Sequence, residues 1–193
     1  MSAQAITHYS IEDYLHRERE ASEKSEYFKG EIFMMAGASF AHNRMNENLS
    51  IRVGTFLEGK SCQSFSRDFR IHIPENTLFT YPDLVVVCGE PALFDEEEDT
   101  VLNPTIIVEI LSASTASYDR GEKFALYREI TTLKEYVLID STKVWAEVWS
   151  KNKEGLWTLA QELKRIDDKI YFNAIGFTLS LADVYKNSKI EAK

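Results

Sequence analysis

The segment of residues 81–123 constrains this chain most, because it places charged side chains beside apolar runs that should be buried. Asp83 comes directly before the apolar run 84–88, and Glu109 lies within a second apolar run, 105–111. Lys123 follows shortly after the second run. A charge at such a place costs free energy unless it is paired or binds a metal. This segment is therefore the strongest candidate for a functional site.

Metal-assisted hydrolysis of a phosphodiester is the chemistry that suits these residue types. Carboxylates on adjacent strands can hold Mg²⁺, which prefers oxygen ligands and keeps several of its waters. The ion lowers the pKa of a bound water and polarises the phosphoryl oxygen. A nearby lysine can orient that water or stabilise charge on the phosphate. We expect Asp83 to be the bridging ligand, Glu109 the second ligand and Lys123 the catalytic cation.

Each of these three residues also has a simple structural interpretation. Asp83 could begin a strand after Pro82, Glu109 could face solvent, and Lys123 could be a solvated helix charge. The order of a Pro-Asp pair, a glutamate on the next apolar strand and then a lysine is much less often accidental. The combination therefore favours the site.

Several longer motifs resemble one known family, and the resemblance extends over about residues 8–150. The central motifs are YPD (81–83), IVEILS (107–112), ST (114–115), YDRGEK (118–123) and EYVLID (135–140). The upstream motifs are EY (26–27), GE (30–31), MAG (35–37), Ser39 and HN (42–43). The chain is similar to the Uma-two family of endonucleases, which belongs to the PD-(D/E)XK restriction-endonuclease-like nucleases.

The resemblance implies a restriction-endonuclease-like core, Mg²⁺ as cofactor with Mn²⁺ as a substitute, DNA as substrate and a homodimer. One position departs from the parent motif, which places its lysine two residues after the glutamate. Leu111 stands at that position here. The resemblance implies that the lysine role has moved to Lys123, on the following helix.

Three further residues are possible supports for the site. Glu31 follows a turn glycine and could complete the metal site, or it could be a surface charge of a hairpin. His42 could act on a proton or contact a phosphate, although a structural histidine is the favoured interpretation. Ser112 could contact phosphate or only satisfy backbone groups of a turn. Asp119 is better explained as a helix cap than as a ligand.

Composition and charge set limits on the function. The 193 residues are enough for one domain, in which we distinguish an N-terminal helix and hairpin (8–38), a nuclease core (39–150) and a C-terminal extension (151–193). The net charge of −9 argues against a general nucleic-acid binder but does not exclude a nuclease. Six basic residues are candidates for phosphate contacts: Arg52, Arg67, Arg70, Arg120, Arg128 and Lys134.

The sequence also leads us to expect a cytoplasmic protein. No apolar run approaches the ~20 residues that span a membrane, and residues 1–7 do not resemble a signal peptide. Cys62 and Cys88 form no CxxC pair, which favours free thiols over a disulfide or a zinc site.

Periodicity predicts an α/β domain, in which helices flank a mixed, mostly antiparallel sheet. Ser10 should cap a helix that runs to about residue 21, and Lys29-Gly30 should turn a hairpin. A second helix should open near Ser39. Residues 65–73 alternate as one half-buried strand. Asp119 and Glu122 form a capping box that predicts a helix beginning near Arg120.

Two functions remain open at this point. The first is an Mg²⁺-dependent endonuclease acting on DNA, which the presence of Asp83, Glu109 and Lys123 favours. The second is a non-catalytic interaction module that keeps the nuclease fold, which Leu111 and the acidic net charge favour. Geometry discriminates between them, because an active site needs the two carboxylates close together and the lysine nitrogen within a few ångströms.

Overall fold

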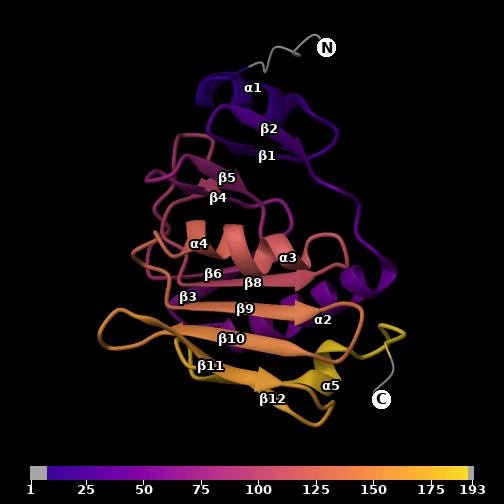
Figure 1. Cartoon of the computed structure of the whole chain (residues 1–193). Coiled ribbons are helices and arrows are strands. Elements are labelled where there is room, and N and C mark those ends of the chain that lie inside the picture. The colour runs from indigo at the N-terminus through magenta and orange to yellow at the C-terminus, as the bar shows by residue number, and fades with distance from the viewer. Residues whose placement is uncertain (1–7, 191–193) are drawn as a thin grey trace.

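A computed structural model of the chain describes residues 8–190 (Figure 1). Its helices are α1 (Ile11–Glu20), α2 (Phe40–Leu57), α3 (Ala116–Tyr118), a π-helical turn (Asp119–Lys123), α4 (Phe124–Tyr127) and α5 (Leu181–Val184). Its strands are β1 (Ser25–Phe28), β2 (Glu31–Met34), β3 (Cys62–Ser66), β4 (Arg70–Ile73), β5 (Leu78–Thr80), β6 (Leu84–Cys88), β7 (Thr100–Val101), β8 (Ile106–Leu111), β9 (Glu135–Asp140), β10 (Ala146–Lys151), β11 (Trp157–Leu163), β12 (Lys169–Phe172) and β13 (Phe177–Ser180).

A six-stranded sheet in the order β11-β10-β9-β8-β6-β3 forms the centre of the fold. Within this sheet, only β8 and β9 pair in parallel, so the sheet is mixed and mostly antiparallel. A smaller sheet, β2-β1-β5-β4-β7, lies at the top of Figure 1, and β12 and β13 form a separate ribbon. The predicted fold class is confirmed, although the strands divide among three sheets.

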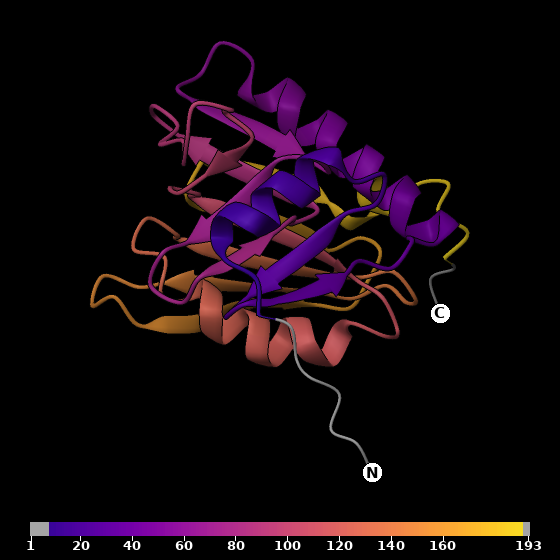
Figure 2. The same cartoon turned by 90° about the horizontal axis from the view of Figure 1, so that it is seen from above.

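Helices cover both faces of the six-stranded sheet (Figure 2). Strand side chains alternate between faces, so Val108 and Ile110 of β8 pack in the core cluster that contains the α2 residue Leu49. Leu111 packs in the opposite cluster, which contains Phe124 of α4. Glu109 has the same parity as Leu111 and therefore points toward the helical segment α3–α4.

Two local predictions near the N-terminus are confirmed. Ser10 caps α1, since its hydroxyl accepts the Asp13 N–H at 3.0 Å. The β1–β2 hairpin turns at Lys29 and Gly30, whose φ angles are 48° and 90°. Positive φ at both central residues is the geometry of the tight hairpin turn that matches the twist of two strands.

The single strand predicted over residues 65–73 is wrong. β3 ends at Ser66 in the six-stranded sheet, and β4 begins at Arg70 in the smaller sheet. Between them, Arg67 has a φ of 66° and the Asp68 N–H donates to the Ser66 carbonyl at 2.9 Å. The rings of Phe65 and Phe69 stack across this turn at 4.3 Å. The four-residue spacing of Phe65 and Phe69 fits the alternation of one strand, but here it arises because the two rings pack against each other across a turn of the chain.

The capping box predicted at Asp119 and Glu122 is also wrong. The helix begins at Ala116, because the Ala116 N–H donates to the Ser112 carbonyl at 3.1 Å and closes the first turn earlier. Asp119 consequently lies in the following π-helical turn and is buried, with 5% of its surface exposed. A π-helical turn inside a helix is frequently found at functional sites.

The expectation of free thiols is corrected by the structure, in which Cys62 and Cys88 form a disulfide. The antiparallel register of β3 and β6 places these two residues directly opposite each other. Sequence spacing does not reveal such a pairing, because it depends on which strands become neighbours. Within residues 8–190, no helix combines the length and apolar character that crossing a membrane requires.

Candidate active site

Asp83 and Glu109 face each other across neighbouring strands. Leu84 of β6 pairs with Val108 of β8, so one step further along the same register sets Asp83 opposite Glu109. The Asp83 N–H lies 3.4 Å from Oε2 of Glu109, and the Ile110 N–H donates to Oδ2 of Asp83 at 2.7 Å. The two acids are therefore held by backbone bonds at the same end of the sheet.

Lys123 reaches this pair from the π-helical turn that crosses the same sheet face. Its Nζ lies 3.0 Å from Oε1 of Glu109, 3.1 Å from Oε1 of Glu26 and 3.8 Å from Oδ1 of Asp119. The sequence predicts a partly exposed lysine in a first helical turn, but only 5% of Lys123 is exposed. The earlier start of the helix accounts for this difference.

The lysine is charged despite its burial. Burial alone would lower the pKa of Lys123, but the carboxylates of Glu109, Glu26 and Asp119 outweigh it and raise that pKa well above its ordinary value. Its charge is thus held among three acids. This arrangement makes Lys123 a fixed positive centre beside Glu109.

The surroundings of Glu109 disfavour its charged form, because burial and the neighbouring acids outweigh the stabilisation by Lys123. Burial raises its pKa to about 7; Lys123 opposes the rise, whereas the neighbouring Asp119 and Asp83 add to it. The Tyr127 hydroxyl donates to Oε1 of Glu109 at 2.8 Å. Burial likewise raises the pKa of Asp119. The excess of acids in this cluster favours the binding of a cation.

His42 lies against Asp83 rather than away from the cluster. Ser39 caps α2, which sets His42 in the first turn, and Nε2 of His42 is 2.7 Å from Oδ1 of Asp83. Asn46, one turn later, donates to the same oxygen at 3.3 Å. Burial lowers the pKa of His42, but the hydrogen bond to Asp83 and the charges of Glu109 and nearby acids give a net rise.

The other two supporting candidates lie apart from the cluster. Glu31 begins β2 opposite Phe28, and no ion pair among residues 8–190 joins it to Lys123. The Ser112 hydroxyl, just beyond β8, bonds with the hydroxyls of Ser114 at 3.0 Å and Thr115 at 3.1 Å. Ser112 therefore stabilises the turn that starts the helix.

Glu26 and Asp119 are the cluster members that sequence reasoning missed. Glu26 lies on β1 between the buried residues Ser25 and Tyr27, so its side chain projects from the opposite face. It also accepts a hydrogen bond from the Thr80 hydroxyl. A signal existed, because Glu26 belongs to one of the upstream family motifs. Asp119 was missed as a member of the cluster because the sequence pattern around it is typical of a helix cap.

The donor set suits Mg²⁺ only in combination with a substrate. Within the described part of the chain, no group of three or more His, Cys, Asp or Glu side chains is arranged to hold a metal ion. Mg²⁺ is usually held by one or two carboxylates together with waters and substrate phosphates. Asp83 and Glu109 match that pattern, since they offer two carboxylates at one sheet end.

One candidate for phosphate contact is excluded by burial. Arg70 has 2% of its surface exposed and pairs with Asp99, while its Nε donates to the Thr100 hydroxyl at 3.1 Å. Arg70 therefore stabilises the loop before β7 and is not available to a ligand.

The sheets flanked by helices make this an α/β protein, and its fold matches that of a solved protein described as a "putative nuclease". The structure is similar to the "Crystal structure of a putative nuclease belonging to DUF820 from Anabaena variabilis ATCC 29413", with a TM-score of 0.73 and 15% sequence identity, over 92% of this chain and 97% of that one. At that identity the likeness concerns the fold alone.

The chain belongs to the Uma2 family, whose model is described as "Putative restriction endonuclease" and matches residues 11–182. Two relatives come from Synechocystis sp. "Uncharacterized protein sll1609" is 40% identical over 77% of this chain and 84% of its own length. "Uncharacterized protein slr1290" is 34% identical over 92% of this chain and 91% of its own length. The resemblance inferred from the motifs is thus confirmed.

Proposed function

We propose that this protein is an Mg²⁺-dependent endonuclease that hydrolyses phosphodiester bonds of DNA. The observation that carries the proposal is the convergence of Asp83, Glu109 and Lys123, with Nζ of Lys123 3.0 Å from Glu109. Membership of a family described as restriction endonucleases supports it independently.

Asp83 and Glu109 would hold the proposed ion together with substrate phosphate and water. When bound, Mg²⁺ lowers the pKa of its water and polarises the phosphoryl oxygen. The Ile110 N–H and His42 orient the Asp83 carboxylate, and Tyr127 and Lys123 orient that of Glu109.

Lys123 has an electrostatic role in this proposal. Its side chain is fixed by three acids, so it needs no reorganisation when charge develops on the phosphate. Such preorganised charge is usually a large contribution to catalysis. The lysine stands in for the one expected at position 111, where Leu111 is fully buried in the apolar cluster under α4.

The alternative is an interaction module that keeps the fold without the activity. The burial of Lys123 and its three acidic partners favour this alternative, because a fully paired lysine can have a purely structural role. The two functions differ in whether the acids bind a metal that supports hydrolysis.

The decisive experiment is cleavage of a mixed panel of single-stranded and duplex DNA and RNA, with Mg²⁺ or Mn²⁺, by wild type and by Asp83→Asn. We expect metal-dependent internal cleavage of DNA by the wild type alone. Calorimetry should detect Mn²⁺ binding to the wild type and little to the variant. A folded wild type that binds Mn²⁺ no better than Asp83→Asn, and cleaves nothing, would establish the interaction module instead.

A homodimer and a cytoplasmic location are further parts of the proposal. Two sites are needed to cut both strands of a duplex together, which is the reason to expect a pair of chains. Light scattering at micromolar concentration tests the assembly, and the monomer mass of 22.2 kDa would contradict it.

A further inference from the structure

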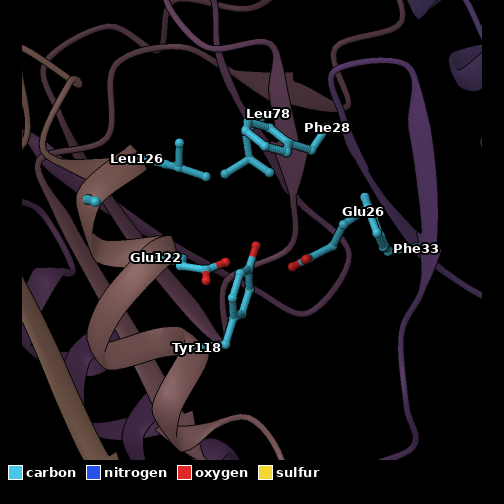
Figure 3. Close-up of a pocket in the computed structure, with 8 residues that line it drawn as sticks. Glu26, Phe28, Phe33, Leu78, Tyr118, Glu122 and Leu126 are labelled. Carbon is cyan, nitrogen blue, oxygen red and sulfur yellow. The ribbon is translucent and has the colours of Figure 1, made fainter.

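A pocket of about 510 Å³ lies beside the acid cluster, between the β1–β2 hairpin and the α3–α4 segment (Figure 3). Leu78, Phe28 and Leu126 form an apolar part of its lining. Its volume falls within the roughly 300–1,000 Å³ that small-molecule sites occupy. Glu26 lines this pocket and also contacts Lys123, yet the proposed mechanism does not use the pocket.

Two aromatic rings of the lining remain accessible to a ligand. Phe33 of β2 is 47% exposed and Tyr118 of α3 is 36% exposed. They come from opposite sides of the pocket, as Figure 3 shows. Exposed rings that border an apolar recess favour a flat, aromatic occupant, and nucleobases stack on such rings whatever their sequence.

The polar part of the lining consists of two carboxylates, Glu26 and Glu122, which approach the Tyr118 ring from opposite sides (Figure 3). Within residues 8–190, no hydrogen bond or ion pair of the protein engages the Glu122 carboxylate. Ionised carboxylates only accept hydrogen bonds. They repel phosphate but accept from the amino groups of cytosine, adenine and guanine, whereas thymine presents a carbonyl oxygen in that place.

Glu26 connects this pocket directly to the candidate active site. Its Oε1 lies 3.1 Å from Nζ of Lys123, which in turn lies 3.0 Å from Oε1 of Glu109. A base in the pocket would thus keep its own phosphodiester near the acids. A base inside a duplex cannot enter a side pocket, so the nucleotide must be single-stranded or turned out of the stack.

We propose that this pocket binds one unpaired nucleobase that carries an amino group, next to the bond to be cut. The inference rests on the proposed nuclease function, and it narrows the substrate to DNA with single-stranded or extruded nucleotides. Guanine is the best occupant, because its two adjacent N–H groups can both donate to one carboxylate.

The test measures nucleoside binding without metal and without catalysis. 2′-Deoxyguanosine and thymidine are titrated into the protein in the presence of EDTA, and binding is followed by NMR. We expect saturable binding of deoxyguanosine and weaker binding of thymidine. Tyr118→Ala and Phe33→Ala should each weaken deoxyguanosine binding by about ten-fold, which corresponds to the loss of one base–aromatic stack.

Tyr171→Ala is the matched control, since Tyr171 is 45% exposed on β12 and lies outside the pocket lining. It should bind deoxyguanosine like the wild type. Glu122→Gln should reduce the preference for deoxyguanosine over thymidine, because an amide both donates and accepts. Melting temperatures verify that every variant is folded, as expected for exposed side chains.

Three outcomes would overturn the base pocket: no nucleoside binding by folded wild type, binding unchanged by both aromatic substitutions, or a preference for a simple diamine such as putrescine. Cleavage without nucleoside binding would remove the pocket proposal alone. Nucleoside binding without cleavage would remove the nuclease proposal and leave the pocket as a base-binding site.

Discussion

Nζ of Lys123 lies 3.1 Å from Oε1 of Glu26. This ion pair joins the π-helical turn, which lies over the six-stranded sheet, to strand β1 of the smaller sheet. Glu26 also accepts a hydrogen bond from the Thr80 hydroxyl on β5. The lysine that the sequence assigns to catalysis therefore also holds two parts of the fold together. Its substitution should affect both activity and stability.

Lys123→Ala should lower the cleavage rate by ~10²–10³, the usual loss for one stabilising group. It should also lower the free energy of unfolding by about 3–5 kcal/mol, because Glu26, Glu109 and Asp119 would be left without their buried cation. Cleavage and urea unfolding are measured on one preparation, with Lys153→Ala, an exposed lysine in the turn between β10 and β11, as control. Full activity in a folded Lys123→Ala protein would exclude this lysine from the mechanism.

His42→Ala should weaken Mn²⁺ binding by ~10–100-fold, the usual cost of removing a group that orients a metal ligand. The reason is the 2.7 Å contact between Nε2 of His42 and Oδ1 of Asp83. Calorimetry provides the measurement. His16→Ala is the control, since that side chain is 75% exposed on α1. Equal Mn²⁺ affinity in both variants would mean that His42 does not position Asp83.

Glu109 should make stability depend on pH in the neutral range. Burial raises its pKa from the ordinary 4.5 to about 7, so the folded state binds a proton that the unfolded state has released. The resulting stabilisation is complete below pH 4.5 and is lost as the pH rises through 7. Without metal, the melting temperature of the wild type should therefore fall relative to Glu109→Gln between pH 5 and pH 8. A constant difference between the two proteins would contradict the raised pKa.

Reduction of the Cys62–Cys88 disulfide should lower the free energy of unfolding by about 2–4 kcal/mol, because the bond closes a loop between residues separated by 26 positions. Urea unfolding with and without reductant measures the change. A variant with Ser at both positions should be as unstable as the reduced protein and insensitive to reductant. If reductant leaves the unfolding of the wild type unchanged, the two thiols are not paired in solution.

Much of the local structure is determined by the sequence alone. The Ser10 cap, the Lys29-Gly30 turn and the apolar run that forms β8 follow from patterns within a few residues, so pattern reasoning identifies them. Because Glu109 interrupts that apolar run, the pattern places its carboxyl group in a buried strand. For this reason the sequence alone predicts Asp83, Glu109 and Lys123 as candidate site residues.

Only the tertiary structure decides which distant groups meet. Glu26 rather than Glu31 contacts Lys123, because the pairing of β1 with β5 brings that face of the hairpin to the helix. The disulfide depends likewise on β3 and β6 becoming neighbours. Periodicity reports what each segment buries, but not against which other segment, because that choice depends on the packing of the whole chain.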